Sequence, residues 1–204
     1  MAVSEVSETV GGDRDGLGMW VLRDVLLGAG FALFLWVSHT WQGGAVSAWA
    51  AVVVSVLGFV VAYASCYVMH EWGHLAGARV AGARLPLGSC RGVLLGLFDT
   101  RAHTRKQFQS MSIGGVAFYL LTAALFVTFA VLFADSVVFL AGAVGGIAFV
   151  AQSLAVDLPI IWRVAGGEDV TQAATTGAAP AVILRRTWQS WLCVAGVAAI
   201  IYGV

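Results

Sequence analysis

The residue pattern most able to carry out chemistry is His70-Glu71-Trp72-Gly73-His74, which lies inside a strongly apolar stretch. On a helix, side chains four positions apart share one face, so His70 and His74 can bind the same metal ion. Glu71 lies beside that pair and can take a proton from a metal-bound water molecule. Ionisable side chains inside a membrane are costly and usually functional. The pattern therefore predicts a zinc site with His70 and His74 as ligands and Glu71 as the catalytic base.

The composition places that motif in a membrane protein. Hydrophobic residues make up 60% of the chain, charged residues make up 11%, and the mean hydropathy is +0.89. These values exclude an ordinary soluble domain and are typical of a chain that crosses the bilayer several times. The formal net charge of zero gives no indication of a nucleic-acid partner. Cys66, Cys90 and Cys193 are too scattered for a metal-ligand pattern or a disulfide framework.

Apolar runs long enough to cross a bilayer about 30 Å thick divide the sequence into helices. We expect an all-α integral membrane protein with about five spans, at 20–41, 48–78, 111–134, 137–162 and 187–204. The expected organisation is a polar N-terminal tail (1–19), an accessory helix (20–41), a three-helix core (48–170) and a C-terminal helix (187–204). A cleaved signal peptide within 14–48 is the alternative for the first span.

The positive charges all fall on one side of this arrangement. The 11 Lys and Arg residues lie before or at the start of the first span, between the second and third, or between the fourth and fifth. Because cytoplasmic loops are enriched in Lys and Arg, we expect the N-terminus in the cytoplasm and the C-terminus outside. We expect the cell membrane as the location.

A catalytic zinc usually has a third protein ligand and one open position. Asp157 is the preferred candidate, because at a rise of about 1.5 Å per residue it lies about as deep in its helix as His70 does in its own. Pro159 follows it and can kink the helix, which helps a short carboxylate to reach a neighbour.

Two other side chains are alternative third ligands, Asp169 and His103. Asp169 would lie beyond the membrane unless the chain turns back after Gly166-Gly167. A simpler interpretation of Asp157 is an ion pair with Arg163 near the cytoplasmic boundary.

These residues resemble the site-2 protease family of intramembrane zinc metalloproteases. That family places an H-E-x-G-H signature in one core helix and an aspartate ligand in the next core helix but one. Here the signature stands as His70-Glu71-Trp72-Gly73-His74, and Ala155-Val156-Asp157-Leu158-Pro159 replaces the family's N-x-x-P run ending in D-G. The intervening span opens with Ser112-Ile113-Gly114-Gly115, where the family often has a Gly-Pro pair. The resemblance covers about 48–170 and implies a metalloprotease core of three transmembrane helices.

The resemblance also implies a structure for residues 83–98. In the family, the segment after the H-E-x-x-H helix is extended and lines the active site. Here this segment is apolar but interrupted by Gly88, Gly92 and Gly96, which makes it poor as a helix. We expect a short re-entrant strand pair, to which an extended substrate could add as a further strand. A loop lying on the membrane is the alternative.

Together these features predict an intramembrane zinc endopeptidase that cleaves transmembrane segments near the cytoplasmic face. Zn²⁺ is the expected cofactor, and the expected partners are a transmembrane protein substrate and the lipid bilayer. The alternative is a zinc-binding membrane protein that hydrolyses nothing and acts as a partner-binding or assembly factor. Glu71 argues against that alternative, because a structural zinc site has no use for a base. The sequence indicates neither the particular substrate nor the oligomeric state.

Overall fold

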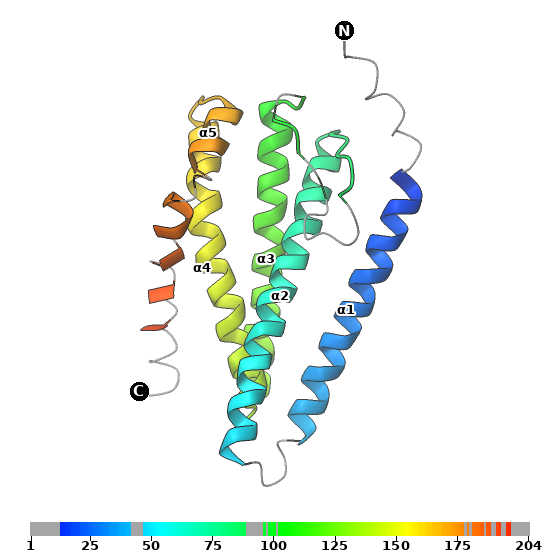
Figure 1. The fold of residues 1–204 in the computed structure, drawn as a ribbon, viewed down its shortest axis with the longest axis vertical. Coiled ribbons are helices and arrows are strands. Elements are labelled where there is room, and N and C mark those ends of the chain that lie inside the picture. Colours follow the sequence, from blue (N-terminus) through cyan, green and yellow to red (C-terminus); the bar gives the residue numbers. More distant parts are fainter. Residues whose placement is uncertain are drawn as a thin grey trace.

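Five helices follow one another along the described chain. The computed structural model describes residues 13–41, 47–88, 96, 98–100 and 102–177, and in addition 179, 181–185, 187–188, 191–192 and 195–196. The helices are α1 (Asp13–Trp41), α2 (Ala48–Val80), α3 (Arg105–Leu132), α4 (Val137–Ala165) and α5 (Val170–Gly177). Each of α1 to α4 contains a stretch long and apolar enough to cross a membrane. The predicted class, an all-α membrane protein, agrees with this architecture (Figure 1).

The first four predicted spans appear as helices, but two of them begin earlier than predicted, since α3 begins at Arg105 and not at residue 111 and α1 begins at Asp13. Residues 13–19, which we expected in the polar tail, belong to α1. Leu17 and Trp20 explain the longer helix, because both pack into a buried cluster with Leu75 and Leu85. The predicted fifth span, 187–204, falls largely outside the described residues.

The core consists of α2, α3 and α4, and α1 lies beside α2 (Figure 1). α1 contacts this core near both of its ends. At one end Trp20 is 1% exposed in the cluster with Leu75. At the other end Leu35 packs with Val54 and Phe139. Between these two contacts α1 turns large apolar side chains outward, as expected for a surface that faces lipid.

α2 and α3 approach each other backbone to backbone at the level of the motif. A Cβ atom on Gly73 would overlap the backbone of Gly114, and one on Gly77 would overlap the backbone of Ser110. Ser110 also donates a hydrogen bond from Oγ to the carbonyl of Gly77, at 2.7 Å. Small residues permit this close packing in membranes, where helices associate through van der Waals contact and hydrogen bonds.

The segment after α2 packs against the N-terminal part of α1. Ala83 and Leu85 are each 2% exposed, and Trp20 donates a hydrogen bond from Nε1 to the carbonyl of Gly88, at 3.0 Å. Of the predicted strand pair, the described residues show a single antiparallel bridge, between Leu87 and Gly96, and no strand. Residues 89–95 and 97 lie outside the described part, so the strand pair stays a prediction there.

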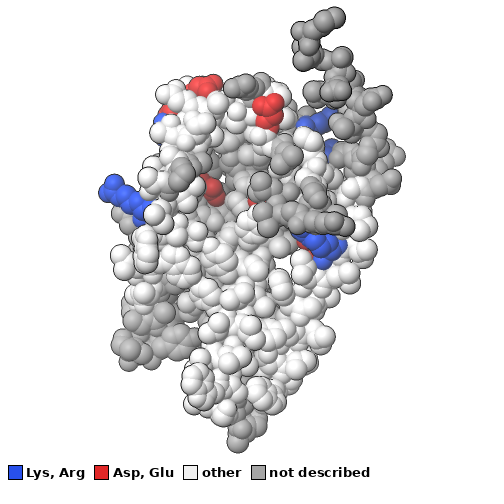
Figure 2. Space-filling model, in the orientation of Figure 1, with Lys and Arg blue, Asp and Glu red and all other residues white. Residues whose placement is uncertain are grey.

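Charged side chains gather toward one end of the molecule. Figure 2 shows them on the upper part of one face, whereas the lower part of that face shows no charged side chain among the described residues. The helix boundaries agree, because Arg79 lies in the last turn of α2, Arg163 in the last turn of α4, and Arg105 and Lys106 at the start of α3. These helix ends meet at one end of the bundle, which is the arrangement that the positions of the cations in the sequence predict.

Candidate metal centre

One face of α2 brings the three motif side chains together. The ligand atoms of His70, Glu71 and His74 all lie within 4.8 Å of one another. Nε2 of His70 and Nε2 of His74 are 2.9 Å apart. Nitrogens held about 2.0–2.1 Å from a tetrahedral zinc ion lie about 3.3 Å from each other. The pair therefore needs only a small adjustment to bind one ion together.

A second contact fixes the orientation of the His74 ring. Nδ1 of His74 lies 3.0 Å from the backbone carbonyl of Met111 on α3. Because a carbonyl only accepts hydrogen bonds, Nδ1 carries the proton and Nε2 keeps its lone pair. Histidine ligands in metal sites commonly donate their other ring N–H to a carbonyl or carboxylate in this way. The lone pair of His74 thus points at His70, where a shared ligand would lie.

Gly115 on α3 forms the wall behind both imidazole rings. A Cβ atom at this position would lie 2.7 Å from Nδ1 of His74 and 2.9 Å from Nδ1 of His70. Any side chain here would push the rings out of place, so glycine is required. The sequence marked Gly114-Gly115 only as the counterpart of a family motif, and this packing role was not predicted.

The first helix contributes polar groups beside the motif. Trp72 donates a hydrogen bond from Nε1 to the Asp24 carboxylate, at 2.7 Å. Asp24 also forms an ion pair with Arg23 at 2.6 Å, and the Arg23 guanidinium lies 3.9 Å from the centre of the Trp20 ring. Glu71, only 9% exposed, lies next to Trp72 in the chain. The sequence predicts α1 only as an accessory helix, and nothing in the local sequence indicates this network.

Asp157, the preferred third ligand, lies inside α4 near the motif but not within the group of atoms described above. Its Oδ2 atom is buried and has no hydrogen-bond partner among the described residues. Its carboxyl is close enough to Glu71 for their charges to interact. A buried carboxylate oxygen without a partner is costly, and a metal ion is one of the groups that can satisfy it.

The alternative ligands have other partners. The carboxylate of Asp169 accepts a hydrogen bond from the backbone N–H of Gln172 at 3.1 Å and so caps α5. Nδ1 of His103 donates to the carbonyl of Asp99 at 2.8 Å. The chain does turn after α4, with Gly167 at a φ of 106°, but Asp169 is exposed there. Neither side chain belongs to the motif cluster.

The alternative interpretation of Asp157, an ion pair with Arg163, is wrong. Arg163 instead forms a two-pronged ion pair with Glu168, with Nε at 2.6 Å from Oε2 and NH2 bonded to Oε1. A planar guanidinium fits a carboxylate in this bidentate arrangement. Asp157 is therefore left without that cation.

The donor set fits zinc. Two imidazole nitrogens, of which that of His74 is in the tautomer that binds a metal, and a nearby buried carboxylate are the ligand types of catalytic zinc sites. Glu71 lies in the same cluster and is the remaining carboxylate available as a base.

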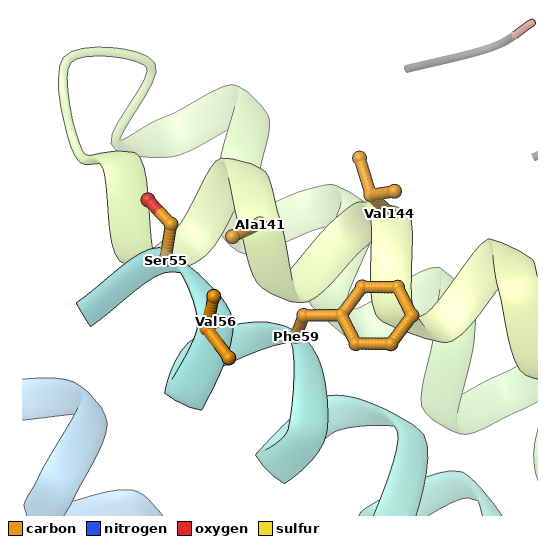
Figure 3. Close-up of a pocket in the computed structure, with 5 residues that line it drawn as sticks. All are labelled: Ser55, Val56, Phe59, Ala141 and Val144. Atoms are coloured by element: carbon orange, nitrogen blue, oxygen red, sulfur yellow. The ribbon is translucent and has the colours of Figure 1, made fainter. Parts of the chain in front are cut away.

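A separate pocket lies away from this chemistry. It has a volume of about 310 Å³ and lies between α2 and α4, lined by Ser55, Val56, Phe59, Ala141 and Val144 (Figure 3). Phe59 precedes His70 by about 16 Å along the helix axis. Its lining, as far as the described residues form it, offers no acid, base or metal ligand.

Comparisons with protein-family models, with curated proteins and with solved structures find no match to this chain.

Proposed function

We propose that this protein is an intramembrane zinc endopeptidase of the site-2 protease type. The observation that carries the proposal is the pair of Nε2 atoms 2.9 Å apart in His70 and His74, with the His74 ring oriented by the Met111 carbonyl. This pair lies inside a helix long and apolar enough to span a membrane, beside the buried carboxylate of Glu71. A site of this kind suits hydrolysis better than simple metal storage, because it includes a base.

The proposed roles follow from the chemistry of each group. His70, His74 and Asp157 would hold Zn²⁺, which when bound acidifies a water molecule and polarises the carbonyl to be cleaved. Glu71 accepts the proton of the attacking water and delivers it to the leaving amine. Gly115 and Met111 keep the imidazole rings in place from α3.

The proposed substrate is a transmembrane segment that becomes extended at the site. A peptide bond inside a helix is shielded by its own backbone, so local unwinding must precede attack. In the proposed orientation the N-terminus lies in the cytoplasm and the C-terminus outside, because Lys and Arg are enriched on the cytoplasmic side. Cleavage would then occur near the cytoplasmic face of the cell membrane.

The decisive experiment compares the wild type with Glu71→Gln after reconstitution into liposomes. Both proteins are analysed for bound zinc and incubated with a library of single transmembrane peptides, and new termini are identified by mass spectrometry. We expect about one zinc per chain in both, and cleavage by the wild type alone. Glu168→Gln is the matched control, because Glu168 pairs with Arg163 outside the site and should leave cleavage intact.

Two outcomes would contradict the proposal. Cleavage by Glu71→Gln at the wild-type rate would show that Glu71 is not the base and would contradict the proposed mechanism. Zinc bound in both proteins without any cleavage would favour a non-proteolytic zinc-binding protein that acts as a partner-binding or assembly factor.

A further inference from the structure

Tyr119 on α3 is buried against the candidate metal centre, and its hydroxyl makes no hydrogen bond with the described residues. The residue is 0% exposed, and Oη has no hydrogen-bond partner among the described residues. Its ring lies 5.4 Å from the His70 ring and 5.6 Å from the Phe149 ring, measured between centroids. Burying a hydroxyl without a partner costs about 1–3 kcal/mol. Packing alone does not account for the hydroxyl, since phenylalanine would fill the same space without that cost.

The unpartnered oxygen of Asp157 is the complementary group. Asp157 Oδ2 is likewise buried without a hydrogen-bond partner in the described part of the chain. Leu154 on α4 packs against the buried cluster that contains Tyr119, and Asp157 follows Leu154 by about one helical turn, near enough to Tyr119 for their side chains to interact electrostatically. A phenol donates and a carboxylate accepts, so one hydrogen bond between them would satisfy both atoms.

We propose that Tyr119 is a positioning residue, whose hydroxyl donates a hydrogen bond to the Asp157 carboxylate when metal binds and so holds that carboxylate in the orientation that binds the ion. This inference rests on the metal site of the proposed function. It gives α3 a second role at that site, because α3 would orient the carboxylate from α4 as well as the imidazoles from α2. Hydrogen bonds from such outer groups typically affect metal affinity by 10–100-fold.

The test uses Tyr119→Phe in the full-length protein and measures two quantities without any substrate. The first is zinc affinity, from competition with a chelator of known affinity, and we expect it to fall about tenfold. The second is the thermal midpoint of the metal-free protein, which should stay unchanged or rise because an unpaired buried hydroxyl is removed. A merely structural tyrosine would not produce this combination.

Tyr63→Phe is the matched control. Tyr63 packs in the same cluster, but its hydroxyl donates to Gln152 at 2.5 Å. Its removal should lower the thermal midpoint and leave zinc affinity unchanged. The double variant Tyr119→Phe with Asp157→Ala should bind zinc no more weakly than Asp157→Ala alone, since Tyr119 acts through that carboxylate.

Three results would overturn the role of Tyr119. These are wild-type zinc affinity in Tyr119→Phe, an equal further loss in the Asp157→Ala background, and wild-type affinity in Asp157→Ala itself. A protein that binds zinc as expected but cleaves nothing would contradict the proposed protease and leave this role of Tyr119 standing. A wild type that binds no zinc would overturn both.

Discussion

His74 and Met111 are joined across the contact of two helices by a hydrogen bond from the imidazole Nδ1 to the backbone carbonyl, at 3.0 Å. The bond fixes which nitrogen of His74 is free to bind a metal. Because the acceptor is a backbone atom, its position depends on how closely α3 approaches α2 and not on the identity of residue 111. The geometry of the His70–His74 pair therefore depends on how closely the glycines at the contact between α2 and α3 let the two helices pack.

Replacing either imidazole should remove the metal. In His70→Ala or His74→Ala we expect zinc content to fall from about one ion per chain to near zero, because a single imidazole and a carboxylate leave too few ligands. Elemental analysis of the purified protein measures this. His39→Ala is the control, since His39 lies among Phe133 and Phe139 at the far end of α1. Full zinc content after loss of both His70 and His74 would refute the site.

The third ligand can be identified by comparing two aspartates. Asp157→Ala should abolish cleavage and weaken zinc binding, because its Oδ2 is the one buried carboxylate oxygen without a hydrogen-bond partner among the described residues. Asp169→Ala should leave both nearly unchanged and cost only the helix cap, about 0.5–2 kcal/mol. Zinc titration and a cleavage assay on the same preparations measure the difference. If Asp169→Ala loses the metal and Asp157→Ala keeps it, the assignment is reversed.

Enlarging the glycines between α2 and α3 should destabilise the bundle. In Gly77→Ala the new methyl group meets the Ser110 backbone, and we expect a loss of about 1–3 kcal/mol from overpacking. Reversible unfolding in detergent measures it. Gly30→Ala is the control, because nothing lies within 4 Å of a Cβ there. Equal stability of the two variants would mean that the helices are farther apart than described.

The polar contact between Asp24 on α1 and Trp72 in the motif should contribute measurably to the stability of the protein. Asp24→Ala removes the acceptor of the Trp72 N–H and the partner of Arg23, so we expect a loss of about 1–3 kcal/mol. Asp24→Asn keeps an acceptor oxygen for Trp72 and should lose less. Thermal unfolding of the two variants gives the comparison, and an unchanged midpoint in Asp24→Ala would show that α1 is held by apolar packing alone.

Topology can be tested with reporter tags. A tag before Met1 and another near Thr100 should report the cytoplasm, and a tag after Val204 should report the outside. The reason is the placement of the cations on one side of the spans. Protection from a membrane-impermeant label in intact cells distinguishes the two sides. A C-terminal tag on the cytoplasmic side would mean that the last predicted span does not cross.

The motif and the helices could be predicted because their signals are local. Apolar runs define α1 to α4 to within a few residues at most ends, and the spacing of His70 and His74 places both rings on one helix face. The contribution of α1 could not be predicted, since Asp24 meets Trp72 only through tertiary packing. The partner of Arg163 was missed for a local reason, because the turn after α4 brings Glu168, five residues further on, back to it.

Gly114 and Gly115 are neighbours in the chain, yet different contacts require glycine at each position. A Cβ atom on Gly114 would meet the backbone of Gly73 and Gly77, whereas one on Gly115 would meet the imidazoles of His70 and His74. A descendant that lost its histidines could therefore accept a side chain at position 115 while still needing glycine at 114. Gly114 is required by the contact between α2 and α3, whereas Gly115 is required by the two imidazole rings.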